Sequence, residues 1–199
     1  MVARLLNDSE ISKHKGIFVS LNLPNSLAFF RILLAQLMFF MLVNAPEIFT
    51  QIHISWINYF AALIFVIASV TDFFDGYIAR CWDQKTKLGA ILDPLADKML
   101  ILAAFLGLMM LGRASAWAVY LILVREFFIT GFRVVMASDG VEVAASMAGK
   151  VKTVSQMFAV GFLLMSWPGG ELLLWIAVAL TLYSGFEYIF AYVKAMKKS

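Results

Sequence analysis

The sequence has 199 residues, of which 62% are hydrophobic and 15% are charged, and its mean hydropathy is +0.86. Soluble domains are considerably more polar, so this composition excludes a soluble protein and favours a chain that crosses a membrane several times. The formal net charge of +3 says little by itself, and nothing in the composition indicates a nucleic-acid partner.

Residues 1–20 come before the first apolar run. The opening "MVARLLNDSE" is too polar for the apolar core of a signal peptide. We therefore expect residues 1–20 to form a cytoplasmic N-terminal extension and residues 21–199 to form a single membrane domain.

Six apolar runs follow in chain order. A membrane-spanning helix needs about 20 apolar residues. The runs occupy roughly 26–43, 56–80, 92–111, 115–137, 147–167 and 170–193. They are continuous rather than alternating, which argues against a membrane β-barrel. They predict an all-α, polytopic integral membrane protein with six transmembrane helices.

The basic residues fall in four clusters that six spans place on one side of the membrane, whereas the opposite loops contribute Arg113 alone. By the positive-inside rule, both termini and the loop after the second span are cytoplasmic. The clusters comprise Arg4, Lys13 and Lys15; Arg80, Lys85 and Lys87; Arg133, Lys150 and Lys152; and Lys194, Lys197 and Lys198.

Carboxylates gather where the second span ends and the third begins. Helical periodicity places Asp72, Asp75, Gly76 and Ala79 on one face, and it does the same for Gly89, Asp93 and Asp97. The eight residues between Arg80 and Gly89, "CWDQKTKL", are polar enough for a short turn in water. The two spans therefore predict an antiparallel hairpin with two carboxylate pairs near its cytoplasmic end.

Four carboxylates in a partly desolvated place repel one another unless a cation neutralises them. Ligands that are all oxygen suit Mg²⁺ or Mn²⁺ rather than zinc. Four carboxylates indicate two ions with bridging ligands, an arrangement that promotes displacement at phosphorus.

Plainer explanations exist for single residues of this group. Gly76 alone would more often serve helix packing than ligand access, and Asp83 in the loop is expected to be solvated. One membrane aspartate could relay protons or pair with Arg80 or Lys98. Pro94 indicates that the third helix either begins near Asp93 or bends there. A cation transporter or a scaffold with a decayed site would also carry membrane carboxylates, but neither requires the full spacing.

The spacing Asp-x2-Asp-Gly-x2-Ala-Arg-x8-Gly-x3-Asp-x3-Asp, from Asp72 to Asp97, resembles the signature of the CDP-alcohol phosphatidyltransferase family. The resemblance implies a membrane enzyme that moves a phosphatidyl group from a CDP-linked lipid to an alcohol and releases CMP. By position, Asp72, Asp75, Asp93 and Asp97 match the family's metal ligands, and Asp97 also matches its general base.

Other positions match family contacts to the CDP group. They are Gly76, Arg80 and Thr86 and, at the start of the first span in "PNSLA", Asn25 and Ser26. Ala28 stands where the family usually has threonine, which weakens that contact.

Three further segments, "NLPNSLAFFR", "REFFITGFR" and "GKVKT", resemble the bacterial members of the family whose acceptor is glycerol 3-phosphate. This resemblance implies CDP-diacylglycerol as donor, the inner (cytoplasmic) membrane as location and a homodimer as a candidate assembly. Other acceptors within the family, namely phosphatidylglycerol for cardiolipin, serine or inositol phosphate, would use the same aspartates.

A phosphate-bearing acceptor needs basic residues beside the diphosphate of the donor. We expect these residues to be Arg125, Arg133, Lys150 and Lys152. Lys150 and Lys152 could instead anchor the chain at the membrane surface. Arg125 differs, because a charge inside "LILVREFFIT" is costly without a partner.

Overall fold

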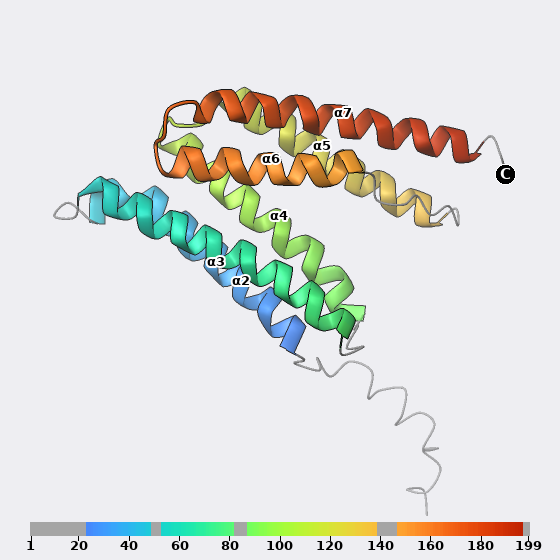
Figure 1. Cartoon of the computed structure of the whole chain (residues 1–199), viewed down its shortest axis with the longest axis horizontal. Coiled ribbons are helices and arrows are strands. Elements are labelled where there is room, and N and C mark those ends of the chain that lie inside the picture. The colour runs from blue at the N-terminus through green and yellow to red at the C-terminus, as the bar shows by residue number, and fades with distance from the viewer. Residues whose placement is uncertain (1–22, 49–52, 82–86, 139–146, 197–199) are drawn as a thin grey trace, which may run out of the picture.

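The structure is a computed structural model that describes residues 23–48, 53–81, 87–138 and 147–196. Over these ranges the chain is all-helical (Figure 1). The helices are α2 (Leu23–Ile48), α3 (Ile54–Cys81), α4 (Lys87–Met110), α5 (Ala116–Ser138), α6 (Met147–Leu164) and α7 (Gly170–Met196). The predicted extension, residues 1–20, lies outside the described residues.

Each of the six predicted runs coincides with one helix, so the all-α prediction is confirmed. The largest differences are at the end of α2, which reaches Ile48 rather than 43, and at the start of α4, which begins at Lys87 rather than near residue 92 and contains Pro94 in its interior. The alternative that this helix starts near Asp93 is therefore wrong. Gly89 and Ala96 on either side of Pro94 are buried, whereas Pro94 itself is exposed, and an interior proline removes one backbone hydrogen bond from the helix.

The helices form two groups, as Figure 1 shows. In the first, α3 and α4 run antiparallel and α2 packs along both. In the second, α6 pairs with α7, and α5 packs against α7. The two groups meet where α6 contacts α3 and α4 and where α5 contacts α4. Helix α4 therefore belongs to the first group and also touches the second.

Small residues allow the first group to pack closely. Ala35 on α2 and Ala68 on α3 are fully buried. At Gly107 of α4 an added Cβ would lie 2.7 Å from Cδ1 of Leu42, so α2 and α4 approach too closely for a side chain there. Close backbone approach through small residues is the usual mode of helix packing in membranes.

The outer surface of the bundle is strongly apolar. Large side chains such as Leu33, Trp117 and Phe190 are 67%, 72% and 72% exposed. A surface of this kind faces lipid rather than water. Within the described ranges, three segments are long and apolar enough to cross a membrane, namely Asn25–Asn44, Ile54–Asp72 and Gly170–Lys194. Charged residues interrupt the apolar character of the other three helices.

A polar contact joins the two groups at one end of the bundle. Nη1 of Arg113, in the turn between α4 and α5, donates to Oδ1 of Asn58 on α3 at 2.8 Å and to the carbonyl of Leu164 at 3.3 Å. Leu164 ends α6, where the helix dipole favours a cation. Arg113 therefore ties the first group to the second, at the end opposite the aspartates.

Candidate active site

Helices α2, α3 and α4 bring two of the predicted aspartates together around Arg31. Nη1 of Arg31 lies 2.7 Å from Oδ1 of Asp72 and also donates to Oδ1 of Asp97. The arginine side chain is fully buried, whereas the two carboxylates are 40% and 47% exposed. One buried cation therefore offsets part of the negative charge of two carboxylates, which remain open to a ligand.

The local sequence explains this convergence. The buried face of α2 runs through Asn25, Ala28, Arg31 and Ala35 at helical spacing. Ser26 lies outside that face and is exposed. Among the positions of α3 whose side chains the structure describes, Ala68 is the last buried one, and Asp72 follows it by one turn. The buried apolar positions described on α3 are Ile57, Ala61, Phe65 and Ala68.

Several predicted site residues cannot be placed. The side chains of Asp75, Arg80 and Asp93 lie outside the described residues, as do the surroundings of Gly76 and the whole of Thr86. Within the described part, no three His, Cys, Asp or Glu side chains gather into a metal site.

The donor chemistry at Asp72 and Asp97 nevertheless fits a hard cation. Both carboxylates direct an oxygen at the same positively charged nitrogen of Arg31. They belong to the oxygen class of ligands that Mg²⁺ and Mn²⁺ prefer.

A second polar group is built around Glu126 of α5. Oε1 of Glu126 accepts from Nζ of Lys152 on α6 and lies 3.2 Å from Nη1 of Arg125. Nη2 of Arg125 also donates to Oγ of Ser184 on α7 at 2.7 Å. All three charged side chains are mostly buried. The charge of Arg125 is therefore paired within its apolar surroundings, while its buried Nε makes no hydrogen bond in the described structure.

Helix α7 makes room for this arrangement. At Gly185 an added Cβ would lie 3.2 Å from Nε of Arg125, so a larger residue would press on the guanidinium. One turn away, Nε2 of Gln156 donates to Oγ1 of Thr181 at 2.8 Å and fixes α6 against α7.

The four basic residues predicted to bind the acceptor do not all gather here. Arg125 and Lys152 share Glu126. Arg133 is exposed and lies over the ring of Tyr188, 5.0 Å from its centroid, within electrostatic reach of Arg125. Lys150 is exposed and two residues from Lys152, so the helix directs it elsewhere.

Lys98 on α4 joins Arg125, Arg133 and Lys152 in what we call the basic group. The sequence indicated Lys98 only as a salt-bridge partner of an aspartate. Its Nζ donates to Oγ1 of Thr130 on α5, and Oγ1 of Thr130 donates to the carbonyl of Glu126 at 2.7 Å. Lys98 also interacts electrostatically with Glu126, Arg133 and Arg125. Its neighbour Asp97 points to Arg31 instead. Helix α4 thus separates an acidic side from a basic side.

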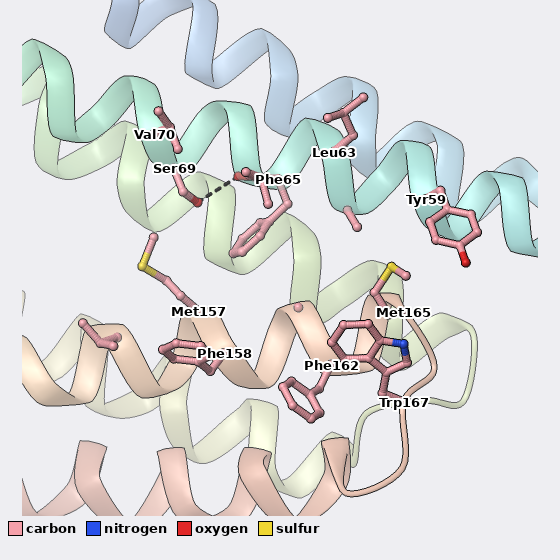
Figure 2. Close-up of a pocket in the computed structure, with 14 residues that line it drawn as sticks. Tyr59, Leu63, Phe65, Ser69, Val70, Met157, Phe158, Phe162, Met165 and Trp167 are labelled. Atoms are coloured by element: carbon pink, nitrogen blue, oxygen red, sulfur yellow. Dashed lines mark hydrogen bonds between the residues drawn. The ribbon is translucent and has the colours of Figure 1, made fainter.

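An apolar groove lies between α3 and α6, with a volume of about 620 Å³. Figure 2 shows Ser69 and Val70 near one end and Tyr59 and Trp167 near the other. Asp72 follows Ser69, which lines the groove, by three residues, about one turn of α3. The groove therefore begins beside the acidic side of the site.

A helical bundle with a lipid-facing exterior, converging carboxylates and buried cations defines an integral membrane protein with a charged site next to an apolar groove. Residues 21–183 match the CDP-alcohol phosphatidyltransferase family, and the chain belongs to that family. The resemblance drawn from the aspartate spacing is thereby confirmed.

Among curated proteins, the chain is similar to three bacterial relatives, all named CDP-diacylglycerol–glycerol-3-phosphate 3-phosphatidyltransferase. The relative from Bacillus subtilis is 40% identical over 191 residues, covering 89% of this chain and 98% of the relative. That from Rickettsia felis is 39% identical, covering 89% and 96%. That from Escherichia coli K12 is 39% identical, covering 85% and 94%.

Proposed function

We propose that this protein transfers the phosphatidyl group of CDP-diacylglycerol to glycerol 3-phosphate, giving phosphatidylglycerophosphate and CMP. The observation that carries the proposal is that two consecutive residues of α4, Asp97 and Lys98, face different charged groups on different helices. Asp97 bonds Arg31 beside Asp72, whereas Lys98 bonds Thr130 beside Arg125 and Glu126. The diphosphate of the donor needs divalent cations held by carboxylates, and the anionic acceptor needs basic side chains. The names of the similar bacterial enzymes agree with this assignment.

In this reaction the primary hydroxyl of the acceptor attacks the phosphorus that bears diacylglycerol. A phosphorus–oxygen bond forms to the acceptor, the bond to CMP breaks, and Asp97 takes the proton of the attacking hydroxyl. Asp97 suits this role because its carboxylate is 47% exposed and lies on the helix that also faces the basic group. Arg125 and Lys152 hold the acceptor's phosphate through charge-assisted hydrogen bonds.

Two divalent cations, Mg²⁺ or Mn²⁺, are part of the proposal. Asp72, Asp75, Asp93 and Asp97 would hold them, and ions of this kind offset the negative charge of a diphosphate during displacement at phosphorus. Arg31 already holds Asp72 and Asp97 close to one another.

The groove between α3 and α6 accommodates one acyl chain of the donor. From Val70 to Tyr59 the groove follows α3 for eleven residues, about 16 Å at the rise of a helix. One leaflet of the hydrocarbon core is about 15 Å thick. The lipid head would then lie at Asp72 while the chain extends along the groove.

All six helices cross the membrane in this proposal, and the site faces the cytoplasm of the inner membrane, where soluble glycerol 3-phosphate and CMP are exchanged. Charged residues on α4, α5 and α6 are compatible with spanning, because the mostly buried ones, Arg125, Glu126 and Lys152, face the bundle interior and pair there. The homodimer implied by the family resemblance is also proposed, and the mass of the detergent-solubilised protein tests it.

An acceptor panel tests the function. Purified protein is incubated with CDP-diacylglycerol, Mg²⁺ and either glycerol 3-phosphate, glycerol, serine, phosphatidylglycerol or inositol phosphate, and CMP release is followed. We expect release with glycerol 3-phosphate, loss of release in EDTA and recovery with Mg²⁺ or Mn²⁺.

Asp97→Asn is the matched control for this assay. It should bind CDP-diacylglycerol but release no CMP, since an amide cannot accept the proton. Preference for serine, glycerol or another acceptor would reject the proposed product, and full turnover in EDTA would reject the metal ions.

A further inference from the structure

The ammonium group of Lys98 differs from the other buried or half-buried cations of the site in its partner. Arg31 is bonded to two aspartates, and Arg125 and Lys152 are bonded to Glu126. Within the part of the chain that the structure describes, Lys98 bonds the neutral hydroxyl of Thr130 and no carboxylate.

An ammonium group has three donors, and one of them is used by Thr130. The positive charge of Lys98 is therefore not offset by a bonded carboxylate among the described residues, although Glu126 and Asp97 attract it from a greater distance. Three cations, Lys98, Arg125 and Lys152, act on this one glutamate, and Arg133 lies within electrostatic reach of Lys98 and Arg125. Such a group attracts an anion that carries more than one charge.

Lys98 is next to Asp97 in the chain, and this position determines which end of the acceptor Lys98 can reach. Asp97 and Lys98 are consecutive on α4, and consecutive helical side chains point about 100° apart. Asp97 is the proposed base for the acceptor's hydroxyl. A three-carbon acceptor with a hydroxyl at one end and a phosphate at the other fits two neighbouring groups of this kind.

We infer that Lys98 binds the phosphate of the acceptor and so selects a phosphorylated acceptor over its neutral analogue. This inference rests on the proposed function. The Thr130 hydroxyl holds the ammonium in place between α4 and α5, and the acceptor's phosphate takes the remaining donors. Lys98 thereby fixes the acceptor's far end while Asp97 engages the hydroxyl.

The test compares Lys98→Met with Thr130→Val in steady-state assays with CDP-diacylglycerol. Lys98→Met removes the charge but keeps much of the side chain's length, whereas Thr130→Val removes the tethering hydroxyl and leaves the charge. We expect Lys98→Met to raise KM for glycerol 3-phosphate by about tenfold to a hundredfold, the range of a charge-assisted contact. KM for CDP-diacylglycerol should not change.

Thr130→Val should raise KM for glycerol 3-phosphate by less than Lys98→Met does, about twofold to fivefold, because the ammonium loses its tether but can still reach the phosphate. Lys98→Arg should restore much of the affinity. A readout without turnover is the rise in melting temperature of the detergent-solubilised protein on adding glycerol 3-phosphate, which Lys98→Met should reduce and Thr130→Val should retain. If Lys98→Met does not fold, Lys98→Gln provides the same comparison.

A purely structural role would appear as equal effects of Lys98→Met and Thr130→Val on melting temperature and on both KM values, and it would overturn the inference. So would an unchanged KM for glycerol 3-phosphate in Lys98→Met. In both cases the wild-type protein still uses glycerol 3-phosphate, so the proposed function survives. Failure of the wild-type protein to use that acceptor would instead reject the proposed function.

Discussion

The side chain of Arg31 is fully buried and serves two carboxylates at once. Removing one partner from such a group leaves charges without compensation, which is usually much more costly than the pair itself is stabilising. Because Asp72 and Asp97 are each partly exposed, water and ions can replace part of the positive charge and hydrogen bonding that Arg31 supplies. The stability of this region should therefore depend on divalent cations once the guanidinium is gone.

We expect Arg31→Met to lower the free energy of unfolding by about 1–3 kcal/mol in EDTA. A divalent cation at a hundred times its dissociation constant should restore about 2.7 kcal/mol by mass action, since it binds the folded carboxylates. Thermal unfolding in detergent, with and without Mg²⁺, measures both effects.

Arg113→Met is the matched control, because in the described structure Arg113 bonds Asn58 and a carbonyl but no carboxylate. It should lose stability without gaining a response to Mg²⁺. Equal melting of Arg31→Met and wild type in EDTA would contradict the role assigned to Arg31.

The convergence of Asp72 and Asp97 could be predicted from their helical spacing, whereas other contacts of the site could not. The argument that found Arg125, a charge in an apolar run, applies equally to Arg31 in "FFRILLAQ" and would have identified it. Lys150 and Lys152 could have been separated, since residues two apart on a helix face different directions. The Lys98–Thr130 bond could not be predicted, because sequence alone does not specify which helix lies opposite α4.

At the scale of elements, the sequence predicts the helices better than their pairing. Long apolar runs and polar turns determine where each helix begins and ends within a few residues. The contact of α4 with both groups of helices depends on features spread along the chain, such as the close approach of Gly107 to Leu42. The groove between α3 and α6 is likewise invisible in the sequence, since its lining residues resemble any lipid-facing surface.

The groove gives a prediction for α6. Gly161 lines it, and nothing lies within 4 Å of a Cβ added there, so a larger residue fills the groove without a clash. We expect Gly161→Leu to raise KM for long-chain CDP-diacylglycerol by about tenfold, equivalent to part of a buried aliphatic chain. A short-chain donor should be affected less, and KM for glycerol 3-phosphate should be unchanged.

Gly131→Leu on α5 is the matched control, because an added Cβ there also meets nothing within 4 Å and Gly131 does not line the groove. It should leave both KM values unchanged. If the two variants behave alike toward long and short donors, the acyl chain does not occupy the groove.

At the scale of the whole molecule, the two ends of the bundle have different chemistry. One end holds the aspartates, the basic group and the last turn of α7, which contains Lys194. The other end holds short turns, aromatic residues and Arg113, whose charge is tied to Asn58 and the end of α6. Because the exposed basic residues Arg133, Lys150 and Lys194 lie at the aspartate end, the positive-inside rule predicts that this end faces the cytoplasm.

Helix α7 provides the sharpest test of this orientation. Its 27 residues are about 40 Å long, more than the hydrocarbon core of about 30 Å, so its ends should reach opposite surfaces. Glu171 in its first turn and Lys194 in its last turn are both exposed. In a protein made cysteine-free by Cys81→Ser, Glu171→Cys should react with an impermeant maleimide in intact cells, whereas Lys194→Cys should react only after permeabilisation. Labelling in the reverse order would place Asp72, Asp97 and the basic group outside, away from soluble acceptor. Labelling of both positions from one side would show that α7 does not span the membrane.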